Sequence, residues 1–345
     1  MSLFSGKLKV LFGICLGAAF LVIAFYGLDW VQLRHAFGRV HWRMFVAAVA
    51  VVFLSHLIRA LRWKYLLNAV KPIPLNQLFS ALLIGYFVNG LLPAHLGEIA
   101  RAGVAAGKGG VRTSTVLGTI LLERIIDALS LFGLIVTAML LSPLPDWVEK
   151  SGYVIFISGI CMLVSLVVIK SFPLLRGKIL ALLLKPLPGS FSARTEHAIS
   201  GFCLGIRNLK RRRDWLIVLL QTCLIWICYW AVMLIGFHTL EMDRLFTLGG
   251  VAALVCLVTS TIGVAVPSSP GYVGTYHLLC QISLIYFGVP REEGLAYGIV
   301  VHAINFLPVT AVGFMLTLKE GLWRFTKKTG YGSKSMIVGT QYKDD

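Results

Sequence analysis

The chain has 345 residues, of which 57% are hydrophobic and only 14% are charged, and its mean hydropathy is +0.82. Soluble domains carry about 45–50% apolar and roughly 25% charged residues, so this composition excludes a water-soluble globule. The formal net charge is +17, but the bases stand between long uncharged runs rather than along a polar domain. That arrangement argues against nucleic-acid binding and is typical of cytoplasmic loops beside anionic lipid. The sequence therefore predicts a polytopic membrane protein.

Uncharged runs mark the expected membrane segments, because a helix needs about 20 apolar residues to cross the bilayer core. In chain order the runs are 10–28, 44–58, 72–97, 128–145 (with the less polar 113–126 before it), 151–169, 215–240, 245–290 and 294–318. The run at 10–28 lacks a convincing small-residue cleavage site, so we interpret it as a retained anchor rather than a signal peptide. The run at 44–58 is short, and we expect Arg43 and Arg59 to extend from its ends toward the membrane surface.

Two of these runs contain a break made of proline and glycine. Pro93 and Gly97 end one run, and Pro267 and Gly271 stand at the same spacing inside another. A break at membrane depth is tolerated only where protein or a watery cavity satisfies the freed backbone groups. Each broken run could be two full crossings or a re-entrant hairpin. Both alternatives return the chain to the same side, so charge counting does not separate them.

The two breaks also indicate an internal repeat. A crossing stands on either side of each break, which gives repeat one at about 44–141 and repeat two at about 215–318. The single crossing between the repeats inverts the second one, so we expect the breaks to enter the membrane from opposite faces. Inverted repeats whose broken helices meet near the midplane are typical of secondary transporters. Chance similarity of the short matching stretch is the alternative.

The distribution of lysine and arginine predicts the topology. Most of these bases fall in loops on the side of the N-terminus, so both termini are expected in the cytoplasm. This count places Arg59 and Arg62 in an inner loop. The predicted fold class is an all-α polytopic membrane protein with about six full transmembrane helices plus two re-entrant (broken) helix hairpins in an inverted repeat. A single transmembrane domain spans 1–324 and includes an amphipathic cytoplasmic-side linker at 170–213, and a flexible tail follows at 325–345.

Ionisable residues inside apolar runs are candidates for a functional site, because a charge within the membrane is costly. Glu98 and Arg101 follow the first break on one helical face, and the next span contains Glu123, Arg124 and Asp127. Two close carboxylates in a low-dielectric site would share a proton or pair with an arginine. The alternative is a charge-paired contact that only fixes the packing of helices.

The second break offers no charged side chain, because 245–290 contains no Asp, Glu, Lys or Arg. The hydroxyl group of Thr275 and the free N–H groups of the helix that follows Gly271 could bind an anion. The other polar side chains that could line the same cavity are His277, His302 and Asn305. For the two histidines, the alternative is a hydrogen-bonded structural role.

The sequence contains no P-loop, no G-x-S-x-G, no H-E-x-x-H and no cysteine–histidine metal spacing. We therefore expect no enzyme activity, no cofactor and no metal, and any transport should run without ATP. The seven cysteines are scattered, which is typical of small hydrophobic side chains. Glu241 and Asp243 in an outer loop are similar to the acidic pair of membrane glycosyltransferases, which keeps lipid glycosylation as an alternative.

Four motifs in this order resemble the lysylphosphatidylglycerol synthase/flippase transmembrane-domain family over roughly residues 8–320. They are Arg59-x-x-Arg62-Trp63-x-x-Leu66-Leu67, Asn89-x-x-x-Pro93-x-x-x-Gly97-Glu98-x-x-Arg101, Glu123-Arg124-x-x-Asp127 and Pro267-x-x-Pro270-Gly271-x-x-Gly274. The resemblance implies an inner-membrane domain that moves lipids between leaflets, aminoacylated phosphatidylglycerol in the best-known members. It also implies that the charged residues lie in a central cavity that faces Pro267–Gly274. Synthase–flippase fusions carry a soluble aminoacyl-transferase domain, so we expect a stand-alone member that does not itself attach lysine to lipid.

The expected function is that of a flippase-like lipid translocase in the bacterial inner membrane, with a phospholipid or lipid-linked headgroup as cargo. The alternatives are a membrane enzyme or subunit in lipid glycosylation or modification, and a small-solute secondary transporter. Expected partners are the cargo lipid, anionic headgroups at the cytoplasmic face and a second copy of the chain, with no nucleic acid. The candidate headgroup-binding residues are Glu98, Arg101, Glu123, Arg124, Asp127, Asn89, Pro93, Gly97, Pro267, Pro270, Gly271, Gly274, Thr275, His277, His302 and Asn305.

Overall fold

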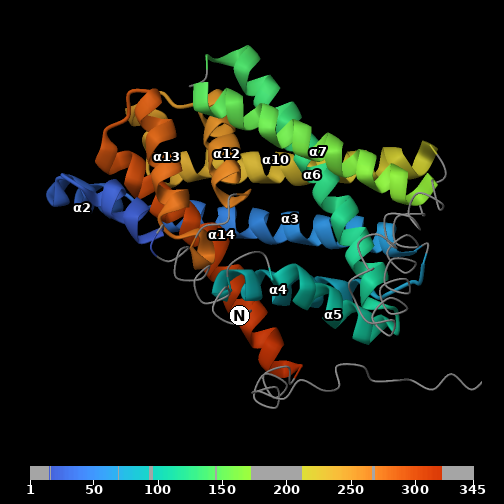
Figure 1. Cartoon of the computed structure of the whole chain (residues 1–345). Helices are drawn as coiled ribbons and strands as arrows, with labels where there is room; N and C mark the ends of the chain where they lie inside the picture. Colours follow the sequence, from blue (N-terminus) through green and yellow to red (C-terminus); the bar gives the residue numbers. More distant parts are fainter. Residues whose placement is uncertain are drawn as a thin grey trace, which may run out of the picture.

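The computed structural model describes residue 15 and residues 17–68, 70–92, 96–143, 146–171, 212–265 and 269–320. All regular structure in these ranges is helical (Figure 1). Four of the described helices are long and apolar enough to cross a membrane, namely α3 (Trp42–Asn68), α6 (Thr113–Leu141), α10 (Arg212–Thr239) and α14 (Arg291–Lys319). The helix α7 (Asp146–Ser171) has 26 residues. The prediction of an all-α polytopic membrane protein is confirmed at this level.

The helices α3 and α10 form a long antiparallel pair through the middle of the molecule (Figure 1). Three contacts show that the two helices run in opposite directions. Two of them join the end of α3 to the beginning of α10, and the third joins the beginning of α3 to the end of α10. The Arg62 guanidinium donates to Thr222 Oγ1 at 2.9 Å, and the His41 N–H before α3 donates to the Thr239 carbonyl at 2.8 Å. The Tyr65 hydroxyl donates to Asp214 at 2.7 Å. The short helices α2 (Trp30–Gly38) and α11 (Met242–Leu245) stand before α3 and after α10 along the chain.

The first break lies between two short helices, α4 (Leu75–Leu91) and α5 (Gly97–Gly109), which pack against each other. We call this pair the first hairpin. A Cβ at Gly97 would stand 1.9 Å from the Gly85 carbonyl oxygen, so only glycine allows this approach. The Asn89 side chain accepts a hydrogen bond from the Gly97 N–H at 2.7 Å and ties α5 to α4. The 17 residues of α4 reach about 25 Å, short of the hydrocarbon core of about 30 Å.

The second break has the same general construction. The helix α12 (Gly250–Ala265) packs against α13 (Thr275–Tyr286), and the 3₁₀ turn η1 (Pro270–Tyr272) stands between them. We call this unit the second hairpin. Gly271 and Gly274 have φ angles of 66° and 92°, which only glycine adopts without strain.

The beginning of the chain covers the second hairpin. A Cβ at Gly274 would stand 2.2 Å from the carbonyl oxygen of Gly17, which belongs to the helical stretch 17–25. The Gln281 side chain in α13 also donates to the Ala24 carbonyl at 3.2 Å, across 257 residues of sequence. This packing fixes the second hairpin from the side of the N-terminal helix.

The two hairpins meet beside α14, which packs against α4 and α13. The turn η1 contacts α4, and a Cβ at Gly271 would stand 3.6 Å from the Gly90 carbonyl oxygen. The described parts of both breaks are therefore pairs of packed helices that are shorter than the four spanning helices, and their re-entrant insertion stays a prediction. Their insertion from opposite faces, the inverted repeat, the count of six full crossings and the cytoplasmic termini remain predictions.

One sequence prediction is wrong, because α3 continues ten residues beyond the predicted end at Ile58. Arg59 and Arg62 were placed in an inner loop, but they lie within this helix and are only 5% and 0% exposed. Acidic side chains on α6 pair with them and make their burial possible. Most of the predicted linker at 170–213 and the whole tail at 325–345 lie outside the described residues.

Candidate functional site

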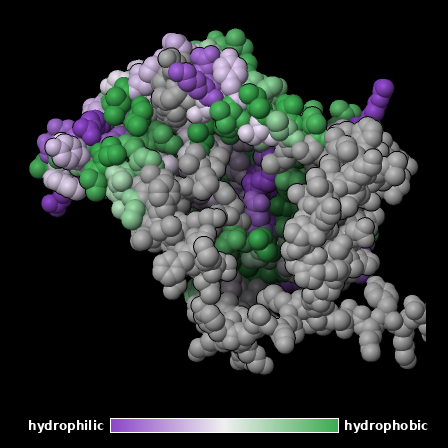
Figure 2. Space-filling view, viewed as in Figure 1, coloured by the Kyte–Doolittle hydropathy of each residue, from purple (hydrophilic) through white to green (hydrophobic). Residues whose placement is uncertain are grey.

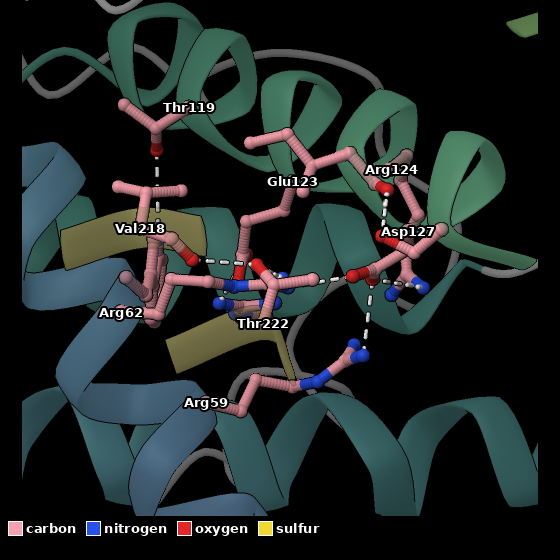
Figure 3. Close-up of polar contacts among 12 residues, drawn as sticks. Arg59, Arg62, Thr119, Glu123, Arg124, Asp127, Val218 and Thr222 are labelled. Atoms are coloured by element: carbon pink, nitrogen blue, oxygen red, sulfur yellow. Dashed lines mark hydrogen bonds and ion pairs between the residues drawn. The ribbon is translucent and has the colours of Figure 1, made fainter. Parts of the chain in front are cut away.

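Seven charged side chains converge from three helices into one network, and Figure 3 shows the part of it around Asp127. The helices α3 and α6 supply most of them, and α5 supplies the remainder at the start of the second arm of the first hairpin. The members are Arg59 and Arg62 on α3, Glu98 and Arg101 on α5, and Glu123, Arg124 and Asp127 on α6. All five charged residues singled out inside apolar runs therefore belong to one site, together with two arginines that sequence reasoning assigned elsewhere.

Asp127 is the centre of the network. Its carboxylate accepts from Arg59 at 3.0 Å and from Arg62 at 2.8 Å, and both arginines approach it from α3 (Figure 3). Arg62 also donates to Thr222 on α10 at 2.9 Å, which connects the network to the antiparallel helix pair. The spacing of Arg59 and Arg62 puts both on one helical face, so a single carboxylate reaches both.

A second buried pair joins the first hairpin to α6. Arg101 donates to Glu123 at 2.7 Å, and the side chains are 3% and 1% exposed. The guanidinium of Arg101 also lies 3.6 Å from the centroid of the Trp63 ring, a cation–π contact. The Trp63 indole N–H in turn donates to Thr119 at 3.1 Å. Arg101 is thus enclosed on both sides and holds α5 against α3 and α6.

The most open part of the network is the pair formed by Arg124 and Glu98. Arg124 Nε and Glu98 Oε1 are 2.6 Å apart, and the side chains are 35% and 24% exposed. A further contact from Arg124 to Asp127 is long, at 3.9 Å. Figure 2 shows hydrophilic residues gathered in a recess near the middle of the face in view, over the middle of α3 as seen in Figure 1.

The network carries more positive than negative charge. Four guanidinium groups face three carboxylates, so the seven side chains carry a net charge of +1 although each arginine contacts at least one carboxylate. Arg59, Arg62 and Arg101 each also keep a buried Nε without a hydrogen-bond partner among the described residues. Buried charge of this kind is costly unless it is paired. The arrangement is therefore suited to binding an anion.

The candidate residues of the second break form a separate group on η1, α13 and α14. His302 Nε2 donates to the Gly271 carbonyl at 2.9 Å, and His277 Nδ1 accepts from the Gly274 N–H at 3.3 Å. The two imidazole rings are 4.8 Å apart and perpendicular. These bonds favour the structural role for both histidines, because each one stabilises a glycine that has a positive φ.

The remaining candidates of this region have simpler surroundings. Asn305 donates to the Val301 carbonyl of its own helix at 2.9 Å. Thr275 is buried, and its hydroxyl has no hydrogen-bond partner among the described residues. Pro270 begins η1 and Gly274 precedes α13. Pro93 and Pro267 lie outside the described residues, so their predicted contribution is not described.

The turn η1 connects the charged network with the polar residues of the second break. Tyr272 follows Gly271 in η1, and its side chain lies within electrostatic reach of both Arg124 and Glu98. The turn of the second hairpin therefore lies within reach of the charges on Arg124 and Glu98, and it packs against α4 of the first hairpin. In contrast, Asn89 and Gly97 close the first hairpin by their contact with each other and, within the part of the chain that the structure describes, form no hydrogen bond with the charged network.

Sequence reasoning missed the buried role of Arg59 and Arg62. A signal was available, because Arg59, Arg62 and Trp63 continue the helical spacing of the apolar run rather than a polar loop. The acidic pair Glu241 and Asp243, which kept lipid glycosylation as an alternative, contacts two histidines. Glu241 pairs with His41 at 2.6 Å and Asp243 with His238 at 2.8 Å. The described residues contain no group of three or more histidine, cysteine or acidic side chains that could hold a metal ion.

The comparisons with known proteins agree with the motifs. The model of the family described as the lysylphosphatidylglycerol synthase TM region matches residues 10–313. This stretch contains both hairpins and all seven side chains of the charged network. Neither the curated proteins nor the solved structures gave a match.

Proposed function

The chain belongs to the lysylphosphatidylglycerol synthase TM region family, and from this premise we propose that it is a translocase that moves a lipid headgroup between membrane leaflets without ATP. The family and the membrane-spanning helices support a lipid-related function in a multi-pass membrane protein. The proposed location is the bacterial inner membrane with both termini in the cytoplasm. The proposed cargo is a phospholipid or another lipid with a phosphate-linked headgroup.

The observation that carries the proposal is the half-exposed pair of Arg124 and Glu98 beside a buried network with an unbalanced positive charge. A guanidinium can hold a phosphate through two parallel hydrogen bonds. Of the arginines singled out from the sequence, Arg101 is enclosed by Trp63 and Glu123, whereas Arg124 is open on one side. The geometry therefore favours Arg124 as the phosphate contact and gives Arg101 a positioning role.

The buried pairs prepare Arg124 for this role. Asp127 is held by two arginines of α3, and its contact with Arg124 is long, so it does not neutralise Arg124 fully. A phosphate that reaches Arg124 competes with Glu98 for the same guanidinium. The released Glu98 carboxylate can then accept a proton or a cationic part of the headgroup. Such an exchange of partners binds the cargo without leaving a buried charge unpaired at any stage.

The two hairpins supply the path in this proposal. We propose that their short helices enter the bilayer without crossing it, so that the broken ends offer polar backbone groups at membrane depth. The headgroup would pass beside these ends while the acyl chains stay in the lipid. We propose that the protein is not an enzyme, because its sequence has none of the catalytic motifs considered above.

Arg124→Ala tests the proposal in proteoliposomes that contain labelled phosphatidylglycerol, its aminoacyl form or a polyprenyl phosphate. We expect the rate of movement between leaflets to fall about tenfold or more, the scale of losing a charge-assisted hydrogen bond to the cargo. Arg124→Lys should keep part of the rate, because a lysine offers only a point charge. Arg112→Ala is the matched control, since Arg112 is an exposed arginine at the start of the same helix.

Expression and thermal stability of the variants must first match those of the parent. If the folded Arg124→Ala protein moves every lipid as fast as the parent, Arg124 does not contact the cargo. If the parent moves none of the three lipids, the translocase proposal fails for these cargo classes.

A further inference from the structure

The side chain of Phe306 on α14 lies where the two hairpins meet. A Cβ at Gly90 of the first hairpin would stand 3.0 Å from both Cε2 and Cζ of its ring. A Cβ at Gly271 of the second hairpin would stand 2.9 Å from the same Cζ atom. One edge of a single aromatic ring therefore contacts the backbone of both hairpins, and glycine on each side is what allows the approach.

The ring is held in this place by its own helix. His302 stacks on Phe306 with the ring centroids 5.1 Å apart and the planes at 14°. The same imidazole donates to the Gly271 carbonyl, so α14 contacts the turn of the second hairpin by a hydrogen bond and by the ring edge. Pro308 stands two residues after Phe306 inside the helix. A proline removes one intrahelical hydrogen bond, so the turn of α14 that carries the ring has one backbone bond fewer than the rest of the helix.

The position is also continuous with the charged site. Gly271, which touches the ring, is followed by Tyr272, which lies within electrostatic reach of Arg124 and Glu98. Phe306 itself is only half-buried, unlike the fully enclosed aromatic residues Trp63 and Tyr297. The partial exposure of Phe306 at the junction of the two hairpins therefore argues against a role that only fills the core.

We propose that Phe306 forms the constriction between the two hairpins and sets the size of the headgroup that can pass from the Arg124–Glu98 site toward the second hairpin. This inference rests on the proposed translocase function and names a specificity-determining residue within it. The closed arrangement described above then corresponds to a path that is shut at Phe306. Passage requires the ring to leave the gap between Gly90 and Gly271.

The first test compares Phe306→Ala with the parent on labelled lipids of rising headgroup size, namely phosphatidic acid, phosphatidylglycerol and phosphatidylinositol. Removing the ring should raise the rate for phosphatidylinositol relative to phosphatidic acid about tenfold, the scale on which pocket size discriminates substrates. Phe314→Ala is the matched control. Phe314 lies two turns further along α14, packs on Phe87 of the same helix α4, and is not among the ring contacts of Gly90 and Gly271. An unchanged size profile in folded Phe306→Ala would overturn the proposal.

The second test needs no lipid cargo and so separates this inference from the proposed function. Thr310 stands one turn after Phe306, and its hydroxyl oxygen would be 3.7 Å from a Cβ at Gly90. In a folded protein without other cysteines, Thr310→Cys should react with a water-soluble maleimide severalfold faster when Phe306→Ala is added. Phe314→Ala should leave the labelling rate unchanged.

The two tests together assign each outcome. If the parent moves none of the lipids, the proposed function fails, and the labelling rate alone decides whether Phe306 closes a path. An unchanged labelling rate in Phe306→Ala would overturn the constriction whatever the lipid assay gives. Faster labelling with an unaltered size profile would show a gate without selectivity and would contradict the specificity role.

Discussion

The two hairpins are stabilised by different kinds of interaction. The first hairpin leads into a network of charged side chains, in which Arg101 and Arg124 are bound to carboxylates of α5 and α6. The second hairpin has no charged side chain between 245 and 290, and its turn is held by backbone groups, imidazoles and glycines. A buried ion pair is strongly destabilised when one partner is lost, whereas a neutral hydrogen bond is worth less. The two regions should therefore respond very differently to substitution.

The largest expected effect follows from Asp127→Ala in the first region. The change leaves Arg59 and Arg62 without their shared carboxylate, and an unpaired buried charge costs about 3–5 kcal/mol. The double variant Asp127→Ala/Arg59→Ala should recover part of this loss, because it removes one of the stranded charges. Thermal unfolding in detergent measures both. If the single and double variants lose stability additively, Asp127 does not act as the shared partner.

A smaller loss is expected from Gly97→Ala, which tests how tightly the first hairpin is closed. The new Cβ would meet the Gly85 carbonyl and the Asn89 side chain, and overpacking of this kind costs about 1–3 kcal/mol. Gly103→Ala in the same helix is the control, since nothing lies within 4 Å of its position. That control should be neutral or gain up to about 1 kcal/mol from helix propensity. Equal unfolding temperatures for the two variants would contradict the close approach of α4 and α5.

In the second region, His302→Phe keeps an aromatic ring beside Phe306 but removes the hydrogen bond to the Gly271 carbonyl. The expected loss is about 1 kcal/mol, the usual net value of one neutral hydrogen bond. This loss of unfolding free energy is well below that expected for Asp127→Ala. The difference between the two losses measures how differently the two hairpins are stabilised. A loss as large as that of Asp127→Ala would mean that the imidazole carries charge or holds more than one bond.

The smallest effect is a coupling between the two hairpins. Gly90→Ala brings a Cβ to 3.0 Å from the Phe306 ring and should cost stability in the parent but not in Phe306→Ala. Residues in contact typically show coupling energies of about 0.5–3 kcal/mol, and we expect the lower end here because the ring is half-exposed. A double-mutant cycle on unfolding free energies measures the coupling. A value of zero would separate Phe306 from the first hairpin.

Most members of the charged network could be predicted from residue type, but their ion-pair partners could not. Glu98, Arg101, Glu123, Arg124 and Asp127 were identified because a charge inside an apolar run is costly and demands a partner. The sequence did not say which acid meets which arginine. That choice depends on how α5 and α6 approach each other, and it decides that Arg101 is enclosed whereas Arg124 is open.

The end of α3 shows why the two other members of the network, Arg59 and Arg62, were not predicted. Hydropathy alone ends the helix at Ile58, since Arg59 and Arg62 look like the start of a polar loop. The helix continues because Asp127, far away in sequence, accepts hydrogen bonds from both side chains and so makes their burial less costly. The pairing of prolines and glycines predicted the two breaks, but it left open whether each was a hairpin. The structure adds that α4 and α12 are short, at 17 and 16 residues, and the re-entrant insertion stays a prediction.

The contact of Gly17 and Ala24 with the second hairpin has a consequence for the order of folding. The helical stretch 17–25 is synthesised long before α13. The hydrogen bond between Gln281 and the Ala24 carbonyl can form only after another 257 residues have been added to the chain. Contacts of such high sequence separation form late and slowly. The first hairpin and its ion pairs to α6 can assemble while translation continues, but the second hairpin acquires its cover only when nearly the whole chain has been inserted. Deletion of residues 1–28 should therefore leave an early-folding half intact and expose the late one to membrane proteases.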